Sequence, residues 1–327
     1  MRVLITGIGG SIGVHMLAHI LQNTGWEVVG IDSFRHKGLT DRLTTDERLT
    51  IITHDLTAPI SPMMAQKIGT IDYIINLASL SDVQLSIEEP AAFIFNNVQL
   101  MTTMLDYARE AKPKAFIQFS TDEVYGASGE DGAHVEWSPI IPSNPYSASK
   151  AAQEAIAISY WRTYGVPVII TNTMNNFGEM QQAQKFPAMV QKRIENGEVV
   201  TIHGKPGDIG SRYYLHSRNA ADAVLWILTN TKPYLHAPGE IDRPDRYNIV
   251  GDRRINNLDL ATLIAELMGK DFQYELVDFH ATRPGHDKHY GLDGAKLAKL
   301  GWKAPLSFED SLKNTIDWQQ EHPEWLA

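Results

Sequence analysis

The chain of 327 residues contains no cysteine, so disulfide bonds and thiolate chemistry are excluded and a cytoplasmic protein is the simplest interpretation. It also lacks any apolar run near the roughly 20 residues that a membrane-spanning helix requires. The sequence enters the apolar segment Arg2–Thr6 almost at once. We therefore expect neither a signal peptide nor a membrane partner.

Basic residues are outnumbered, with 29 Lys and Arg against 39 Asp and Glu and a formal net charge of −10. This balance argues against nucleic acids and anionic membranes as partners. A negatively charged substrate would have to be bound by a few local basic groups. The apolar fraction of 43% is ordinary for a globular protein, and the length fits one large α/β unit or two associated ones.

Short apolar runs alternate with helical patterns through the first half of the chain. Two of the helical patterns are Gly13–Asn23 and Asn97–Ala111. The alternation predicts an α/β fold with a Rossmann-type, doubly wound parallel sheet. The runs that we expect to form strands are Val3–Thr6, Glu27–Asp32, Thr50–His54, Tyr73–Leu77, Ala115–Ser120 and Val168–Thr173.

The rhythm changes after Asn172, where polar loops separate further helical patterns at Lys185–Asn196, Ser217–Leu228 and Leu258–Met268. The tail Pro305–Leu326 is typical of a loop and an amphipathic helix. We predict a smaller, interleaved C-terminal domain that binds the substrate. The expected boundaries are 1–174 plus about 213–250 for the sheet domain, and 175–212 plus 251–327 for the smaller one.

A glycine-rich turn at 7–13 follows the first expected strand and precedes the first expected helix. Gly7, Gly10 and Gly13 would allow a tight turn and close approach to a pyrophosphate, which the N–H groups near Ser11 and Ile12 would bind. Such a turn alone can be an ordinary flexible loop. Asp32 ends the second expected strand, where an acid binds the adenosine ribose. Together these features predict a dinucleotide site.

Asp32 would repel a 2′-phosphate, and we therefore expect NAD rather than NADP. Arg35 could weaken this preference, although a solvated loop residue is the simpler interpretation. Asp55 and Leu56 could reach the adenine edge or merely end the third strand. Ala78 and Ser79, after the fourth strand, would lie along the cofactor.

The strongest catalytic pattern joins two segments. Thr121, Asp122 and Glu123 follow the apolar run 115–119, which places a hydroxyl and two carboxylates at a strand end. Tyr146 and Lys150 are four residues apart and share one helix face. A lysine and an oxidised nicotinamide would lower the pKa of the phenol towards neutrality and make it a general base. Loop-capping acids and a surface Tyr–Lys pair are the structural alternatives.

On these motifs the sequence resembles the extended short-chain dehydrogenase/reductase superfamily, and within it the dTDP-glucose 4,6-dehydratases. The resemblance covers nearly the whole chain. Its most discriminating part is the Thr-Asp-Glu triplet, since epimerases and decarboxylases of the superfamily generally lack the Asp-Glu pair. The matching segments are 7–13, 78–90, 120–126, 145–150, 175–178, 212–214, 247–249, 283–287 and 300–302.

The resemblance implies a lyase that turns a nucleotide-diphosphohexose into its 4-keto-6-deoxy product without net redox. Tyr146 would take the proton of the 4-OH while NAD accepts the C4 hydride, and Thr121 would bind the same oxygen. Glu123 would remove the C5 proton and Asp122 would protonate the departing 6-hydroxyl. Asp122 then needs a raised pKa, which burial and the neighbouring Glu123 can supply.

The resemblance also implies a set of substrate contacts, with Arg212 as the pyrophosphate arginine. Each of these positions could instead be an ordinary solvated loop residue. No His or Cys spacing indicates a closed metal site, because His280, His286 and His289 lack a His-x-x-x-His arrangement, and we expect no metal. The expected contacts are Ser81, Asn175, Lys185, Arg212, Asn248, Arg283 and His286.

Three functions stay open at this point: the dehydratase, an NAD-dependent nucleotide-sugar 4-epimerase, and a non-catalytic dinucleotide-binding protein of the same fold. The nucleotide base and the hexose are also open. The segments Asn97–Ala111 and Tyr146–Tyr164 correspond to helices that form a four-helix dimer contact in the family. We therefore expect a homodimer.

Overall fold

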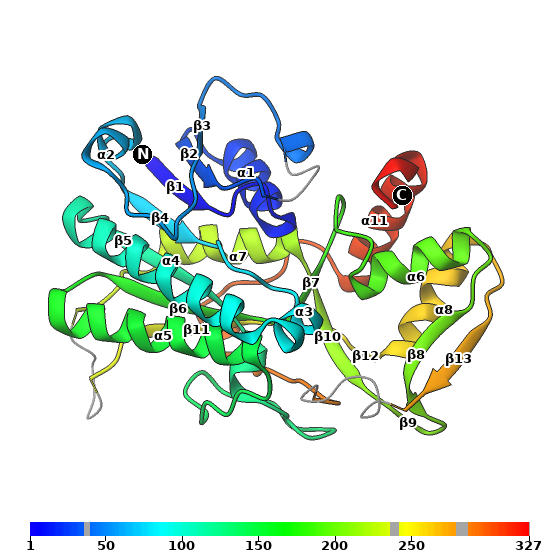
Figure 1. Cartoon of the computed structure of the whole chain (residues 1–327). Coiled ribbons are helices and arrows are strands. Elements are labelled where there is room, and N and C mark those ends of the chain that lie inside the picture. The colour runs from blue at the N-terminus through cyan, green and yellow to red at the C-terminus, as the bar shows by residue number, and fades with distance from the viewer. Residues whose placement is uncertain (36–39, 236–241, 279–286, 327) are drawn as a thin grey trace.

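The computed structural model describes residues 1–35, 40–235, 242–278 and 287–326, which form a larger and a smaller lobe (Figure 1). The larger lobe is built on a seven-stranded sheet whose neighbouring strands are all parallel. Its order is β11 (Asp245–Ile249), β6 (Val168–Thr173), β5 (Ala115–Thr121), β4 (Tyr73–Asn76), β1 (Arg2–Thr6), β2 (Glu27–Asp32) and β3 (Leu49–Thr53).

The prediction of a doubly wound parallel sheet is confirmed, and the six expected strands lie within one residue of their expected bounds. The seventh strand, β11, was not expected as a strand because Asp245-Arg246 and Asn248 interrupt its apolar pattern. From β1 the chain builds outward first through β2 and β3, and then on the other side through β4. Ligands of such sheets bind at this switch point, outside the carboxyl ends of the strands.

Helices cover both faces of the sheet. On one face α1 (Ser11–Asn23) and α7 (Ser217–Asn230) share a buried apolar cluster with the strands. On the other face α4 (Pro90–Ala111) and α5 (Pro145–Tyr164) form the second cluster. Shorter elements complete the lobe: η1 (Thr40–Arg42), α2 (Pro62–Ile68), α3 (Val83–Glu88), η2 (Asp122–Tyr125) and α10 (Ala295–Lys299).

The smaller lobe has two three-stranded sheets and its own apolar core (Figure 1). One sheet contains β12 (Arg254–Asn256), β10 (Ser211–His216) and β7 (Asn175–Phe177), and the other β13 (Tyr274–Val277), β8 (Val200–Lys205) and β9 (Asp208–Ile209). The remaining elements are α6 (Phe186–Glu195), α8 (Asn257–Met268), α11 (Phe308–Glu321) and η3 (Pro323–Leu326).

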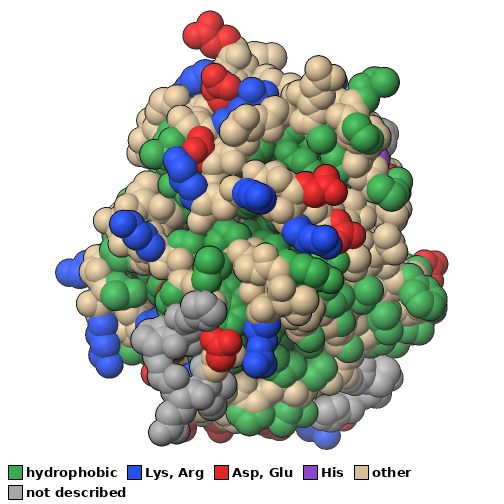
Figure 2. All heavy atoms as spheres, turned by 90° about the vertical axis from the view of Figure 1, so that its left-hand side faces the viewer, with side chains coloured by type: hydrophobic (Ala, Val, Ile, Leu, Met, Phe, Trp, Pro, Cys, Tyr) green, Lys and Arg blue, Asp and Glu red, His purple; other side chains and the backbone are tan. Residues whose placement is uncertain are grey.

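The face at the left of Figure 1, turned toward the viewer in Figure 2, carries hydrophobic patches between charged side chains of both signs. Within the described ranges, no helix combines the length and the apolar character needed to span a bilayer.

Candidate active site

The carboxylate pair lies where β5 ends and the 3-10 turn η2 begins. The Thr121 hydroxyl accepts from the Glu123 backbone N–H at 3.4 Å and donates to Asp122 Oδ1 at 2.9 Å. Asp122 is 3% exposed, and its Oδ2 is buried without a partner among the described residues. Gly126 closes the turn at φ +76°, where a Cβ would meet the Ile141 carbonyl oxygen at 2.4 Å. The turn thus fixes both acids at the carboxyl edge of the sheet.

Asp122 is buried and Glu123 is half-buried, and the two carboxyl groups are electrostatically linked. Burial, followed by the charge of Glu123, raises the pKa of Asp122 to about 7. Burial also raises the pKa of Glu123, against a hydrogen bond from Asn144 Nδ2 at 3.2 Å and the positive charges of Arg212 and Lys185. A carboxyl group that keeps its proton near pH 7 can act as a general acid.

Tyr146 lies in the first turn of α5, which the Asn144 side chain caps by accepting from the Ser147 N–H at 2.9 Å. Burial and then the charges of Glu123 and Asp122 raise the pKa of Tyr146 well above its usual value, while a hydrogen bond with Thr121 lowers it. The phenol therefore shares one buried site with both carboxylates.

The expected lowering of the Tyr146 pKa is not found in the protein alone, since burial and two acids oppose deprotonation of the phenol. Lys150 is 4% exposed and donates to the Phe119 carbonyl and to Gln153, each at 2.8 Å. Burial lowers the pKa of Lys150 to about 8. A positive charge on a bound ligand would act in the opposite direction and lower the pKa of the phenol.

The glycine turn fits a dinucleotide pyrophosphate. Gly7 has φ +67°, and a Cβ on it would come within 3.0 Å of the Ala78 backbone. A Cβ on Gly13 would come within 2.3 Å of the Gly7 carbonyl, so only glycine permits this packing. Gly10 caps α1 without a side-chain bond, and no acid lies in the first turn that holds Ser11 and Ile12. No acidic side chain therefore offsets the positive N-terminus of α1, and its backbone N–H groups can bind an anion.

Asp32 lies at the end of β2 and contacts the glycine turn. Its carboxylate accepts from the Gly9 N–H at 3.0 Å and the Phe34 N–H at 2.9 Å. Arg35 is an exposed loop residue, as the simpler interpretation expects, and it donates to Asp55 at 2.9 Å and to Asn96 at 3.1 Å. Pairing with Asp55 leaves Arg35 poorly placed to weaken the preference for NAD.

Sequence reasoning missed Arg42, which is 9% exposed and donates to the Gly9 carbonyl at 3.2 Å. Among the other expected cofactor residues, Leu56 is buried in the apolar core and the Ala78 N–H donates to the Thr6 hydroxyl at 3.1 Å. The Ser79 hydroxyl donates to the Leu80 carbonyl at 3.1 Å.

The basic residues expected at the substrate lie in the smaller lobe and face the acids. Arg212, on β10, is 7% exposed and donates to the Asp287 carbonyl at 3.1 Å. Lys185 precedes α6, and its ammonium donates to the Ser81 carbonyl at 3.4 Å. Both side chains exert a field on Glu123. The structure thus brings together Thr121, Asp122, Glu123, Tyr146, Lys185 and Arg212.

The other expected substrate residues are less closely joined to this group. Asn175 is half-buried at the start of β7. Asn248 is fully buried and donates to the His134 and Asp293 carbonyls at 2.9 and 3.2 Å. Arg283 and His286 lie outside the described residues.

Tyr290 was missed by sequence reasoning. It is 2% exposed, its ring lies 5.1 Å from the Arg212 guanidinium carbon, and burial followed by Glu123 raises its pKa. Its position twelve residues before Trp302, in a loop, shows no pattern that links it to β5. The aromatic ring forms one wall around Arg212.

A second polar cluster, also missed, joins His15, Glu179 and His216. Their ligand-type atoms all lie within 4.8 Å of one another. His216 Nδ1 accepts from the Arg218 N–H at 3.0 Å, so in the neutral ring Nε2 carries the proton that is donated to Glu179 at 3.0 Å. A metal ion needs a free lone pair on that nitrogen. The hydrogen bonds therefore favour a structural cluster over a metal site.

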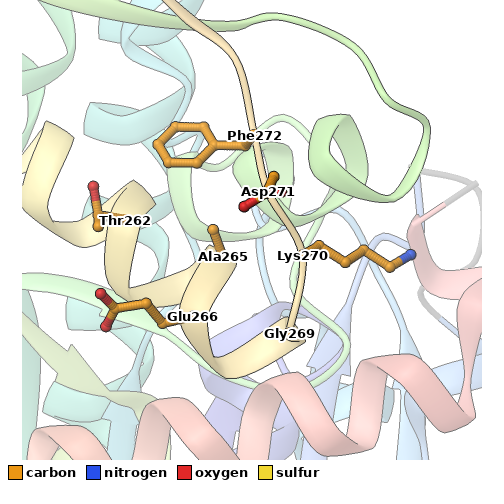
Figure 3. Close-up of a pocket in the computed structure, with 7 residues that line it drawn as sticks. All are labelled: Thr262, Ala265, Glu266, Gly269, Lys270, Asp271 and Phe272. Atoms are coloured by element: carbon orange, nitrogen blue, oxygen red, sulfur yellow. The ribbon is translucent and has the colours of Figure 1, made fainter.

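A surface hollow at the end of α8 lies apart from these groups (Figure 3). In Figure 3, Lys270 and Glu266 point to opposite sides of it. Lys270 is already paired with Glu195 at 2.8 Å. The hollow holds neither the acid pair nor the phenol, and it is lined by Thr262, Ala265, Glu266, Gly269, Lys270, Asp271 and Phe272.

Comparison with known proteins gives consistent matches over the whole chain. The family described as GDP-mannose 4,6 dehydratase matches residues 4–315. A probable dTDP-glucose 4,6-dehydratase of Sinorhizobium fredii is 33% identical, over 99% of this chain and 94% of that protein. DesIV, the dTDP-glucose 4,6-dehydratase of Streptomyces venezuelae solved with NAD and TYD, has a TM-score of 0.88 at 29% identity, covering 99% and 98% of the two chains.

Epimerases have the same fold. The UDP-glucose 4-epimerase of Thermus thermophilus, solved in complex with NAD, has a TM-score of 0.84 at 25% identity, covering 97% of this chain and 98% of that one.

Proposed function

The chain belongs to the GDP-mannose 4,6 dehydratase family, and from this premise we propose that it converts a nucleoside-diphosphate hexose into the 4-keto-6-deoxy sugar nucleotide. It is an NAD-dependent sugar-nucleotide dehydratase, a lyase. The observation that carries the proposal is the convergence of Asp122, Glu123 and Tyr146 in one site. Oxidation alone needs only the phenol, whereas loss of water also needs an acid and a base.

The residues of the larger lobe fit NAD. The α1 N-terminus and the glycine turn would hold the pyrophosphate, Asp32 the ribose, and Ala78 and Ser79 the inner face of the cofactor. When bound, NAD supplies the hydride acceptor and donor of the reaction. Its positive nicotinamide also favours the phenolate form of Tyr146, which the buried acids oppose.

The protons are assigned to the chain's own groups. Tyr146 takes the proton of the sugar 4-OH, with Thr121 bound to the same oxygen. Glu123, supported by positive charges and by Asn144, removes the proton from C5. Asp122, protonated near neutral pH, gives its proton to the departing 6-hydroxyl.

The second lobe supplies the groups for the nucleotide. Arg212 and Lys185 would bind the diphosphate, and their positive charge also keeps Glu123 ionisable. Because relatives are dTDP-glucose 4,6-dehydratases, dTDP-glucose is the first substrate to test. We keep the boundaries 1–174 plus about 213–250 for cofactor binding and 175–212 plus 251–327 for substrate binding, although α10 of the last segment packs on the larger lobe.

The test is mass spectrometry of products from dTDP-, UDP-, CDP- and GDP-hexoses incubated with the protein and NAD. The expected product is lighter by one water, with no net NADH. Return of every sugar nucleotide unchanged would contradict the dehydratase function. Catalytic formation of the product would exclude the non-catalytic alternative.

The 4-epimerase alternative is favoured by one observation, the shared fold with an epimerase that binds NAD. Glu123→Gln separates the two, because a 4-epimerase does not remove the C5 proton. We expect this variant to lose water elimination and solvent deuterium incorporation at C5. Glu130→Gln, at an exposed position, is the matched control. Undiminished inversion at C4 in the Glu123 variant would favour the epimerase.

We also propose a homodimer in the cytosol. The support for the dimer is apolar exposure on α4, where Ile94 is 38% and Phe95 73% exposed. The absence of cysteine fits a reducing compartment.

A further inference from the structure

A row of buried polar side chains crosses the central sheet and ends at Lys150. The Thr6 hydroxyl donates to Asn76 Oδ1 at 2.7 Å, and Asn76 Nδ2 donates to Gln118 Oε1 at 2.8 Å. Gln118 Nε2 then donates to Gln153 Oε1 at 3.1 Å. All four residues are at most 1% exposed. The row links the strand before the glycine turn with the helix that carries Tyr146 and Lys150.

Gln153 is the junction of this row with the active site. Its Oε1 accepts from Lys150 Nζ at 2.8 Å as well as from Gln118, and its Nε2 donates to the Asn97 carbonyl at 2.9 Å. A carbonyl oxygen only accepts, so the amide must turn its nitrogen to Asn97 and its oxygen to the lysine. Three elements, α4, β5 and α5, therefore fix the acceptor that faces Lys150.

The groups around the Lys150 ammonium are almost all neutral. Its other acceptor is the Phe119 carbonyl on β5, and α4 contributes only the neutral Asn97 contact of Gln153. On α5 itself, Tyr146 lies one turn earlier, and the charge of Glu154 reaches the lysine. Glu154 is bound by Arg246 at 2.7 Å and by Asn172 at 2.8 Å.

We propose that Gln153 is a positioning residue, which holds the Lys150 ammonium against β5 through a neutral acceptor and leaves its third N–H for a bound ligand. Two of the three N–H groups are used within the described part of the chain. The neutral acceptor matters because a carboxylate at the same place would stabilise the charged ammonium and raise the pKa of Lys150. An apolar side chain at position 153 would remove one of the two hydrogen-bond acceptors of the ammonium.

This inference rests on the proposed function only in giving Lys150 a part in the reaction, and its test does not require turnover. The measurement is a pH titration of the Lys150 Nζ signal by NMR in protein labelled with 15N-lysine, with the signal assigned through Lys150→Arg. Gln153→Glu should raise the pKa of Lys150 by about one to three units, as expected for an opposite charge in contact. Gln153→Met should lower the pKa, because the charged form loses a hydrogen bond.

Gln191→Met is the matched control, since Gln191 is also buried, at 2% exposure, but lies on α6 and donates to the Ile316 carbonyl. It should leave the Lys150 titration unchanged. If Gln153→Glu does not fold, Gln153→Met and Gln118→Met still test the row, the latter with a smaller shift. An unchanged Lys150 titration in the folded Gln153 variants would overturn the proposal.

The pH profile of kcat provides the second measurement. In Gln153→Glu the profile should move in the same direction as the Lys150 titration, with little change in KM for the sugar nucleotide. If the parent protein turns over no sugar nucleotide while the NMR shifts appear, the proposed function fails and the positioning role stands. A shifted Lys150 titration with an unchanged pH profile of kcat would show that Gln153 holds the lysine without affecting the rate. This result would overturn its role in the reaction.

Discussion

Asp122 and Glu123 are neighbours in the chain but have different surroundings. Asp122 has one bonded oxygen, held by the Thr121 hydroxyl, and one buried oxygen without a partner in the described structure. Glu123 has a donor in Asn144 and the field of two basic side chains. Asp122 therefore retains a proton near neutral pH, because burial and the charge of Glu123 raise its pKa. Two adjacent acids thus acquire opposite roles from burial and hydrogen bonding.

Asp122→Asn tests the acid role. With a pKa of about 7 in the parent, Asp122 loses its proton as the pH rises, so kcat should fall about tenfold per pH unit above 7. The variant cannot donate a proton in this way, and its kcat should be about 100-fold or more lower at pH 7, without the fall at high pH. Stopped-flow measurements of NADH formation should show oxidation at C4 continuing. A parent-like pH profile in the variant would contradict the assignment.

The sequence predicted the acids and Tyr146 because strand-end and helix-face positions follow from local spacing. It did not reveal the partners that tune them. Gln153 is bound by Gln118 of β5 and by Asn97 of α4 only because these elements pack on α5, and Asn144 reaches Glu123 across a loop of some twenty residues. The raised Tyr146 pKa also depends on burial that no local pattern indicates.

At the scale of the element, the N-terminus of α5 is coupled to the acid pair through Asn144. One end of its amide caps the helix by accepting from the Ser147 N–H, and the other donates to Glu123 at 3.2 Å. A single residue therefore fixes the start of the helix that carries Tyr146 and lowers the pKa of the base.

Asn144→Asp separates these two tasks. The aspartate keeps the cap acceptor, which a helix N-terminus favours, but puts a negative charge beside Glu123. The pKa of Glu123 should rise further, so kcat at pH 7 should fall about tenfold or more and recover as the pH rises. Thermal unfolding should change little. Asn256→Asp, at the matching cap of α8, is the control and should keep full activity. Equal losses in both variants would show a general effect of charge.

The cluster of His15, Glu179 and His216 links α1 to the turn after β7 and to the end of β10 in the smaller lobe. Burial, followed by His216, lowers the pKa of His15 to about 4. Burial alone would raise the pKa of Glu179, but the hydrogen bond from His216 and the two histidines lower it to about 2. At neutral pH Glu179 is therefore ionised, whereas the imidazole rings of His15 and His216 are neutral.

This cluster predicts acid sensitivity between pH 6.5 and 4. In that window the unfolded chain binds a proton at His15 that the folded chain excludes, so the free energy of unfolding falls as the pH falls. The loss from His15 amounts to roughly 3 kcal/mol by pH 4. His15→Gln should remove this part of the slope in urea titrations at several pH values. An unchanged slope in His15→Gln would contradict the prediction.

The elements themselves differed in how well the sequence predicted them. The six central strands were expected correctly because continuous apolar runs identify strands buried on both faces. The helix expected at Asn97–Ala111 begins earlier, at Pro90, since exposed Phe95 and Ile94 obscured its pattern. The short strands β7, β9 and β12 have two or three residues and no recognisable period, so only tertiary contacts define them.

At the scale of the molecule, the site is assembled from both lobes. The acids and Tyr146 come from the large sheet and α5, whereas Arg212 and Lys185 come from β10 and the start of α6. Their charges meet at Glu123. Family resemblance predicted a role for each residue, but the approach of β10 to the end of β5 follows only from the way the two lobes pack.

The proposed homodimer is the property of the whole molecule that is simplest to test. Phe95 projects from α4 at 73% exposure, with Ile94 beside it and Leu85 of neighbouring α3 at 40%. A stable protein interface buries about 800 Å² on each partner around a few such apolar anchors. Phe95→Glu would bury a charge in that interface, and should shift the protein to a monomer in analytical ultracentrifugation at micromolar concentration.

Met63→Glu is the matched control, because Met63 is more exposed than Phe95, at 81%, but lies on α2. It should keep the oligomeric state of the parent. A parent protein that sediments as a monomer would remove the dimer, and so would a Phe95→Glu variant of unchanged mass. If the monomeric variant retains full dehydratase activity, then each chain holds a complete site, as expected when the acids, the phenol and both basic residues all come from one chain.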